Sequence, residues 1–316
     1  MPSPPPSPPA PGTGTGEATL SVVLCTHGRP KYLRACLAGL AGQSRREFEV
    51  LVVDSASAPA DAAAVARLAA KFGVRLLRTD EPGLSRARNL GLAEAGGSWV
   101  AFLDDDAVPE PGWAAALLNR IAVLPERAAA LGGRILPAWE EPLPGWWPPS
   151  LRGVLTIIEW EGFGEVGVDL PAGIDMYGAN MAFAAPPLRE IGGFEETLGR
   201  VGNWLLSGEE VEVVDSLRAR GYRAFYEGAA AVRHSIQRER LRPGWLLSRL
   251  LWQGATDALR DRAGGNGQRR LLGAAARLLV QAPLLLWPAT SSALLRARCG
   301  AAYNLGYLRG RFAGAA

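Results

Sequence analysis

The chain of 316 residues is 48% hydrophobic and 21% charged, and its formal net charge is +3. This composition supports a sizeable hydrophobic core and excludes a wholly disordered or fibrous chain. The small net charge argues against a nucleic-acid-binding protein, which needs a concentrated basic surface. The length suits one large α/β domain with an appendage, or two modest domains.

The N-terminal end differs in composition from the rest of the chain. Residues 1–17 are rich in proline and predict a disordered tail, because they contain too few apolar side chains to form a core. They lack the basic start and apolar run of a signal peptide. Cys25, Cys36 and Cys299 show neither a disulfide framework nor the spacing of a metal site. We therefore expect a cytoplasmic location.

Strands and helices alternate after this tail. The pattern predicts strands at 20–26, 47–54, 74–79 and 98–106, and helices at 30–41, 60–72 and 84–94. Such alternation is typical of the α/β class, with a mostly parallel sheet flanked by helices. Polar groups follow three of the strands, at Thr26–Arg29, Asp54–Ser55 and Asp104–Asp106. Ligands bind beyond the carboxyl ends of such strands, so we expect a polar site at this edge of the sheet.

The second half of the chain is less regular. Residues 137–170 are dense in proline and tryptophan, and a long loop of this kind inside a compact domain is usually functional or poorly ordered. After it, the pattern predicts strands at 177–185, 222–228 and 230–236, a helix at 209–220, and helices from Leu241 onward. The uncharged segment 278–295 fits packed helices or a dimer contact, a helix on a membrane surface, or a membrane span.

Three adjacent carboxylates, Asp104, Asp105 and Asp106, end the strand at 98–106. They repel one another, and hard cations such as Mg²⁺ or Mn²⁺ are often held by one or two carboxylates together with substrate phosphates. Alternate residues of a strand share a face, so Asp104 and Asp106 would approach one ion while Asp105 points elsewhere. The alternative is a solvated acidic turn.

Two further groups of polar residues are candidates for ligand binding. Asp54 could cap the next turn or accept hydrogen bonds from a base or ribose. Arg86, Arg88 and Asn89 lie at a turn and helix start, where arginines favour anionic groups. The alternative for this second group is a solvated basic face.

Five segments, in order and at matching spacing, resemble the family 2 glycosyltransferases of the GT-A fold. They cover about residues 19–236 and read SVVLCTHGRP, VVDSAS, GLSRARNLGLAEAGGSWVAFLDDDAVPEPGW, YGANMAFAAPPLREIGGFEE and SGEEVEVVDSLRARGYRAFY. The resemblance implies a Rossmann-like GT-A catalytic domain over 18–240, followed by a helical C-terminal extension over 241–316. It also implies a nucleotide-sugar donor, with UDP-sugars the commonest donors in the family.

The resemblance assigns roles to particular residues. Asp104 and Asp106 match the DxD motif that holds a divalent cation, Mn²⁺ or Mg²⁺, against the sugar diphosphate, and some members place a histidine near the metal at the equivalent of His234. The donor nucleotide would lie near Thr26, His27, Arg29, Asp54, Arg86, Arg88, Asn89, Asp104 and Asp105.

The resemblance also implies an inverting displacement with a carboxylate as general base. The family's Glu-Asp pair reads Glu209–Glu210 here. The extra methylene moves the second carboxylate by about 1 Å, which is near the tolerance of catalytic placement, so the base is either Glu210 or Glu209. Two other functions stay open. A nucleotidyltransferase would need a glycine- and lysine-rich phosphate loop that is missing after the first strand. A catalytically silent nucleotide-sugar-binding protein would keep only the donor pocket.

The acceptor is assigned to the irregular region. Trp139, Trp146 and Trp147, together with Asn180, are expected to bind the acceptor, because aromatic faces stack on sugars and other flat or apolar groups. The alternative is ordinary packing of the loop 137–170. The sequence leaves a saccharide, a natural product, a peptide and a lipid-linked acceptor open. It also leaves open peripheral membrane contact or a homodimer through the C-terminal helices.

Overall fold

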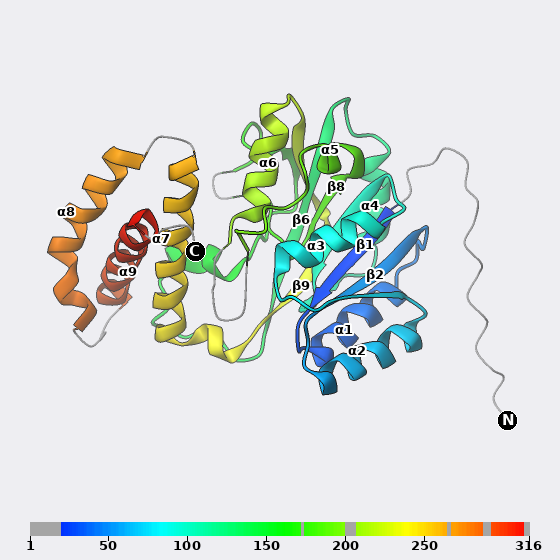
Figure 1. Cartoon of the computed structure of the whole chain (residues 1–316), viewed down its shortest axis with the longest axis horizontal. Helices are drawn as coiled ribbons and strands as arrows, with labels where there is room; N and C mark the ends of the chain where they lie inside the picture. The colour runs from blue at the N-terminus through cyan, green and yellow to red at the C-terminus, as the bar shows by residue number, and fades with distance from the viewer. Residues whose placement is uncertain (1–19, 172–173, 200–206, 264–266, 287–291, 313–316) are drawn as a thin grey trace.

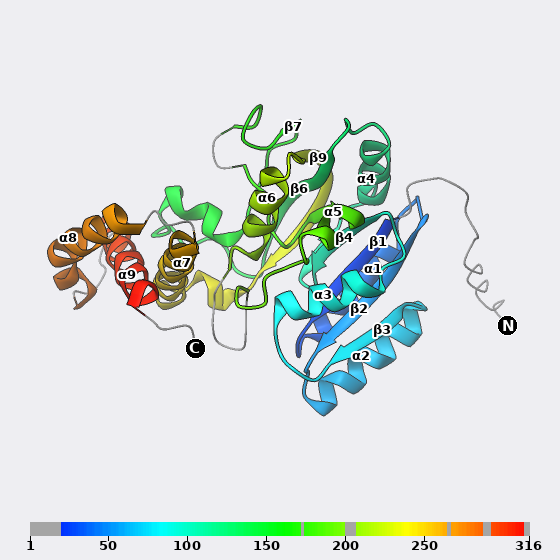
Figure 2. The ribbon, with the colours of Figure 1, turned by 45° about the horizontal axis from the view of Figure 1, so that its top comes forward.

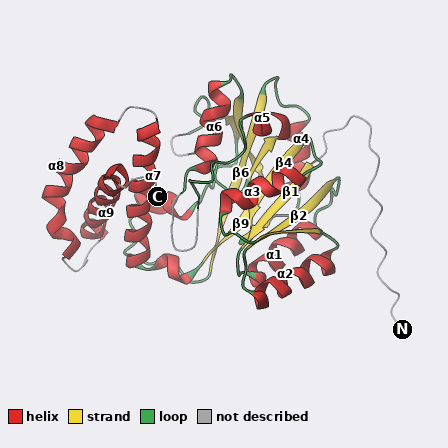
Figure 3. Cartoon of the chain, in the orientation of Figure 1, coloured by secondary structure: helices red, strands yellow, loops and turns green. Residues whose placement is uncertain are grey.

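The computed structural model describes residues 20–171, 174–199, 207–263, 267–286 and 292–312. The predicted tail at 1–17 lies outside these residues. The described chain forms an α/β unit around one mixed sheet, with a helical unit beside it (Figures 1 and 3). The predicted fold class is confirmed.

Four parallel strands form the first half of the sheet, in the order β3-β2-β1-β4. They are β1 (Leu20–Thr26), β2 (Phe48–Ser55), β3 (Arg75–Thr79) and β4 (Trp99–Asp104). The connecting helices are α1 (Pro30–Ala41), α2 (Pro59–Phe72) and α3 (Leu84–Glu94). Helices α1 and α2 lie side by side, with α3 above them in the view of Figure 1. Figure 2 shows α3 in front of the strands and α2 beside β3. Right-handed crossovers require this arrangement, because the chain reverses direction across the sheet after β3.

The register of these strands brings polar residues together at one sheet edge. Thr26 pairs with Asp54 across β1 and β2, and Cys25 pairs with Asp104 across β1 and β4. The apolar residues that precede them are buried in the main core. The predicted polar edge therefore follows from the parallel pairing of three buried strands.

The second half of the sheet contains antiparallel pairings. Strand β8 (Met181–Ala184) pairs with β4 and with β6 (Ala128–Trp139), and β6 runs parallel to β9 (Arg223–Ile236). The short strands β5 (Ala107–Pro109) and β7 (Phe163–Glu165) both pair with β9. The helices of this half are α4 (Trp113–Ile121), α5 (Ala185–Glu190) and α6 (Glu209–Ala219), with 3-10 turns η1 (Pro149–Leu155) and η2 (Arg238–Leu241).

The structure corrects the predicted elements of this half. Strand β4 ends at Asp104 rather than Asp106, because the chain turns back there to pair β5 with β9. The two strands predicted at 222–228 and 230–236 are one continuous strand, β9. The irregular region 137–170 begins inside β6 and contains η1 and β7. Helix α4 and most of β6 were not predicted.

The helices predicted from Leu241 onward are α7 (Pro243–Ala263), α8 (Gly267–Leu286) and α9 (Ser292–Phe312). Small residues bring α7 and α9 close together. A Cβ added at Gly306 would lie 1.8 Å from the carbonyl oxygen of Leu251, and one at Gly254 would lie 2.0 Å from that of Tyr303. Glycine is required at both positions because the facing atoms belong to the backbone.

A second apolar cluster joins these helices to the region that follows β6. Its buried members are Trp147, Leu155, Ile236, Leu241, Leu246, Leu295 and Cys299. The uncharged segment 278–295 is divided between α8 and α9, with 287–291 outside the described residues. Among the described helices, none has the length and apolar composition needed to cross a membrane.

The close approach of α7 and α9 can be tested at Gly306. Gly306→Ala should lower the free energy of unfolding by about 1–3 kcal/mol, because the added methyl group forces the two backbones apart. Thermal unfolding followed by circular dichroism measures the change. The control is Gly244→Ala, where a Cβ on α7 meets no atom within 4 Å. It should leave the melting temperature unchanged or slightly raised, and an equal effect of both substitutions would contradict the packing argument.

Candidate active site

The acidic cluster at the end of β4 is the centre of the site. Asp105 and Asp106 are buried, whereas the side chain of Asp104 is 26% exposed. Because β4 ends at Asp104, Asp105 and Asp106 lie in the following turn. The predicted alternation of Asp104 and Asp106 on one strand face is therefore wrong. The three carboxylates instead occupy different surroundings.

Arg29, in the turn after β1, binds two of these carboxylates. Its Nη1 donates to Asp106 Oδ2 at 2.9 Å, its Nε donates to Asp105 Oδ2 at 3.2 Å, and its Nη2 contacts Asp105 Oδ1. Thr26 Oγ1 also donates to Asp105 Oδ2, at 2.6 Å. Burial nevertheless raises the pKa of Asp105 to about 7, against the opposing charge of Arg29. Arg29 thus neutralises much of the charge that the cluster concentrates.

Asp106 is held by residues at the end of β9 and directly after it. Gln237 Nε2 and Arg240 Nη2 donate to its Oδ2 at 2.8 and 3.2 Å, and His234 Nε2 lies 3.5 Å from its Oδ1. Burial would raise the pKa of Asp106, but the charges and hydrogen bonds of His234 and Arg240 outweigh it and hold the pKa well below its usual range. Asp106 is therefore ionised.

Glu209 and Glu210, at the start of α6, are both buried but have different partners. Arg88 Nη1 donates to Glu209 Oε1 at 2.6 Å, and its Nη2 lies 3.4 Å from Asp104 Oδ1. Glu210 Oε2 is buried and has no hydrogen-bond partner among the described residues. Burial, and then the charge of Glu209, raise the pKa of Glu210 to about 8.

Polar residues after β1 and β2 form the adjoining part of the site. His27 Nδ1 lies 2.5 Å from the carbonyl oxygen of Ser55, and the Gly28 amide donates to Ser57 Oγ at 2.8 Å. Asp54 accepts a hydrogen bond from the Ser57 amide at 3.2 Å and also pairs with Arg78. The structure thus brings His27, Arg29 and Asp54 to the same edge, and Asp54 does cap its turn.

Four predicted binding residues have their side chains engaged in structural contacts. Arg88 is 2% exposed and packs over the Phe194 ring. Arg86 pairs with Glu81 and Glu196, and Asn89 exchanges hydrogen bonds with the Phe194 backbone. Asn180 is buried: it accepts from Trp113 and donates to the carbonyl oxygens of Arg134 and Ala230. Arg86, Asn89 and Asn180 thus have structural partners, and their role in ligand binding stays a prediction.

The three tryptophans predicted to bind an acceptor lie in the second apolar cluster. Trp147 is buried there, and Trp139 and Trp146 pack against it while partly exposed. The Trp146 and Trp147 rings lie 5.5 Å apart. Packing of this region against α7 and α9 therefore accounts for Trp147, whereas Trp139 and Trp146 keep some exposed surface.

Sequence reasoning missed several residues of the site. Gln237 and Arg240 bind Asp106, although they lie 131 and 134 residues after it in the sequence. No local sequence pattern indicated that they belong to the site. Gly178 leaves room for the guanidinium group of Arg88, since a Cβ there would lie 2.2 Å from Arg88 Nη2. This glycine stands two residues before Asn180 in the segment YGAN, so its place in a quoted motif was the one available signal.

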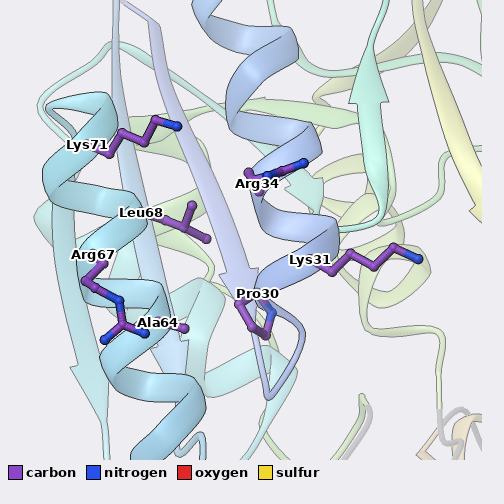
Figure 4. A pocket seen from close by; sticks show the side chains of 7 residues that line it. All are labelled: Pro30, Lys31, Arg34, Ala64, Arg67, Leu68 and Lys71. Carbon is purple, nitrogen blue, oxygen red and sulfur yellow. The ribbon is translucent and has the colours of Figure 1, made fainter.

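A separate cleft of about 480 Å³ lies between α1 and α2 (Figure 4). Its lining contains the chain's two lysines and comprises Pro30, Lys31, Arg34, Ala64, Arg67, Leu68 and Lys71. None of the acidic residues described above contributes to it. The basic lining and the acidic cluster are thus different surfaces.

The residues around Asp106 include possible ligands of a divalent cation. Among the described residues, no group of three or more His, Cys, Asp and Glu side chains is arranged to hold a metal ion by itself. However, Asp106 Oδ1 and His234 Nδ1 are buried and have no hydrogen-bond partner in the described part of the chain. A carboxylate oxygen and an imidazole are suitable ligands, and substrate phosphates commonly supply the others. The two ring nitrogens of His234 point in diverging directions, and Nε2 is the one that faces Asp106 Oδ1, at 3.5 Å. Asp106 Oδ1 is therefore the atom that fits a cation shared with a phosphate-bearing substrate, and His234 lies beside it.

Comparisons with known proteins agree with this architecture. Residues 21–149 match the family described as "Glycosyl transferase family 2". The chain is 30% identical over 251 residues to the glucosyl-dolichyl phosphate glucuronosyltransferase of Haloferax volcanii, with 77% of each protein covered. It is 29% identical to the pre-mycofactocin glycosyltransferase of Mycobacterium tuberculosis, over 76% of this chain but 47% of that protein.

Solved structures share the fold. The mannosyltransferase PcManGT of Pyrobaculum calidifontis, in complex with GDP-Man and Mn²⁺, superposes with a TM-score of 0.57 at 20% identity, covering 90% of this chain and 86% of that one. GalNAc-T7 with UDP, GalNAc and Mn²⁺ gives a TM-score of 0.54 at 17% identity, over 78% and 51% of the two chains.

The fold is the GT-A fold. The chain belongs to the family 2 glycosyltransferases.

The different surroundings of Glu209 and Glu210 predict opposite effects on stability. Glu209→Gln should lower the free energy of unfolding by about 3 kcal/mol, because it removes one charge from a buried ion pair and leaves Arg88 with Asp104 alone. Glu210→Gln should not lower it. Since the folded-state pKa of Glu210 is raised, its ionisation costs native-state stability as pH rises from about 4.5 to about 8.

Chemical denaturation at pH 6 and pH 8.5 measures both effects. Glu210→Gln should be more stable than the unsubstituted protein at pH 6, where the unfolded carboxylate is already ionised, and by a larger margin at pH 8.5. A loss of stability in Glu210→Gln equal to that in Glu209→Gln would contradict the assignment of the ion pair to Glu209.

Proposed function

We propose that this protein transfers a sugar, with inversion, from a nucleotide-diphosphate sugar to an acceptor nucleophile, and that Glu210 is the general base. The observation that carries the proposal is the difference between the two glutamates. Arg88 binds Glu209, whereas Glu210 is buried without a cationic partner of its own, and its pKa is raised to about 8. A base with a pKa near the working pH is well suited to proton transfer.

The donor site in this proposal lies at the carboxyl ends of β1 and β2. Asp54 and His27 face the nucleoside there, and Arg29 is placed to bind phosphate oxygens with a planar, permanently charged group. The solved structures of similar fold contain GDP-Man or UDP, which supports a nucleoside diphosphate in the same place. We take a UDP-sugar as the donor.

Asp106 would hold the divalent cation, Mn²⁺ or Mg²⁺, through its buried Oδ1, which has no hydrogen-bond partner among the described residues. His234, whose Nε2 lies 3.5 Å from that oxygen, would be the second ligand. When bound, such a cation stabilises negative charge on the departing nucleoside diphosphate. Both solved structures of similar fold contain Mn²⁺, which supports this assignment. Arg29 and Arg240, already beside Asp106, would stabilise the same negative charge.

The remaining residues position these groups. Arg88 fixes Glu209 and reaches Asp104, so it connects the start of α6 to the end of β4. Glu210 would accept the proton of the acceptor nucleophile as it attacks the anomeric carbon from the face opposite the leaving group. This single displacement inverts the anomeric configuration and needs no covalent intermediate.

The proposal leaves the acceptor as a saccharide, a natural product, a peptide or a lipid-linked molecule. The partly exposed Trp139 and Trp146 remain available to contact it. Family membership favours glycosyl transfer over nucleotidyl transfer. The raised pKa of Glu210 favours catalysis over silent binding, since a binding protein would not need a buried, unpaired acid beside Glu209.

Glu210→Gln should reduce the rate of sugar transfer by about 10²–10⁴-fold, because glutamine cannot accept the proton. In the unsubstituted enzyme, kcat/KM should rise with pH and level off above about pH 8, where the carboxylate is ionised. Release of nucleoside diphosphate, measured by chromatography from pH 6 to pH 9, gives both results. The matched control is Glu212→Gln on the same helix, which should change neither. A flat pH profile together with an active Glu210→Gln would disprove the role of Glu210.

Asp106→Asn should remove the effect of Mn²⁺ on donor binding, because it replaces the charged ligand of the cation. Thermal shift with UDP or UDP-sugars, in Mn²⁺ or in chelator, measures this effect directly, since stabilisation follows occupancy. The control is Glu110→Gln, a neighbouring carboxylate that pairs with Arg233. The same Mn²⁺-dependent shift in Asp106→Asn and in the unsubstituted protein would rule out this cation site.

A further inference from the structure

The outward face of α8 carries apolar side chains in solvent. Leu272, Leu279 and Val280 are 73%, 82% and 79% exposed, and Ala276 and Pro283 are exposed beside them. The spacing of 272, 276, 279, 280 and 283 places all five residues on one side of a helix. Isolated exposed apolar residues are common, but a continuous stripe over three helical turns marks a surface that binds something.

The opposite side of α8 is already covered. Ala274 is buried with Ala258 and Tyr307, and Leu271 packs against them. Gln281 and Arg277 form hydrogen bonds with Asn304 of α9. Figure 1 shows α8 as the outermost helix, at the end of the molecule away from α1 and α2. The exposed stripe is therefore not the face through which α8 joins the rest of the protein.

The charge of the C-terminal extension indicates what the stripe binds. Residues 241–316 contain eleven arginines, two aspartates and no lysine or glutamate, a formal charge of +9, whereas the whole chain has +3. Helix α8 itself has three arginines and no acidic residue. Arg269 and Arg277 are exposed, and Arg270 pairs with Asp261. An apolar helix face within a strongly basic unit is the pattern that binds anionic phospholipid surfaces.

We propose that the apolar stripe of α8 docks the protein onto an anionic membrane, with the helix lying in the plane of the lipid headgroups. Leu272, Leu279 and Val280 would enter the boundary between headgroups and acyl chains, and Arg269 would contact lipid phosphates. A second copy is a poorer partner, because a symmetric contact through α8 would bring two units of charge +9 together.

Docking would also orient the region that follows β6. Trp147 packs with Leu246 of α7 and Leu295 of α9 in one cluster, so the extension and the tryptophan-rich segment are held together. The partly exposed Trp146 would then be held at a fixed distance and orientation relative to the lipid surface. The docking itself does not depend on the proposed chemistry, and it can fail or succeed independently of it.

Flotation of the full-length protein with vesicles tests the proposal. The probes are vesicles of phosphatidylcholine alone and of phosphatidylcholine mixed with phosphatidylglycerol. The protein should float with the mixed vesicles, and much less with phosphatidylcholine alone or in high salt, which screens the arginine–lipid attraction. Leu279→Glu combined with Val280→Glu should weaken binding to mixed vesicles by roughly tenfold or more, because two buried apolar side chains are lost from the contact.

The control substitution is Val123→Glu, which changes a 68%-exposed valine after α4 and should leave binding unchanged. All three proteins should have the same melting temperature, since the substituted residues are exposed; if the double variant melts lower, Leu272→Ser gives the comparison in its place. Absence of flotation with mixed vesicles would overturn the proposal, as would equal flotation of the unsubstituted and the α8-substituted proteins. A dimer in light scattering that the α8 substitutions dissociate, without vesicle binding, would show that a second copy covers the stripe.

Discussion

The arrangement of this site depends on the neutralisation of three adjacent carboxylates by arginines from distant parts of the chain. Arg29, from the turn after β1, binds Asp105 and Asp106, and Arg88, from α3, reaches Asp104. Without these cations, two buried aspartates beside a third would cost several kcal/mol in desolvation and repulsion. Each arginine comes from a different β–α unit, so folding of the sheet edge also brings the neutralising charges into place.

The same interaction separates the roles of the two glutamates at the start of α6. The single guanidinium group of Arg88 donates to Glu209, with Nη1 at 2.6 Å from Oε1. Glu210 is left with burial and with the charge of Glu209 as its neighbour, which raises its pKa. A similar division occurs in the aspartates: Asp106, surrounded by His234, Arg240 and Gln237, stays ionised, while burial raises the pKa of Asp105. Neighbouring, chemically equivalent residues thus acquire opposite protonation tendencies from their surroundings.

Much of the fold was predictable where local signals agree. The helix limits 30–41 and 84–94 match α1 and α3, because Pro30 starts the first helix and a turn precedes the second. The end of β4 was not predictable, since Asp105 and Asp106 leave the strand only because β5 pairs with β9 further along the chain. The same limit of sequence-based prediction applies to the site. The residue types of the polar edge could be read from strand ends, but the partners of Asp106 and the choice of Arg88 between acids are long-range contacts that no local pattern records.

The C-terminal helices carry different apolar residues on their inward-facing and outward-facing surfaces. Toward the interior, Gly254 and Gly306 remove side chains so that α7 and α9 meet at backbone distance, and α8 adds Ala274 to a small apolar cluster. Toward solvent, α8 keeps large apolar residues that no described element covers. If the apolar content of this unit served packing alone, the large side chains would face inward and the small or polar ones outward. The opposite distribution on α8, in a unit with eleven arginines, is the arrangement expected of a helix whose remaining partner is not protein.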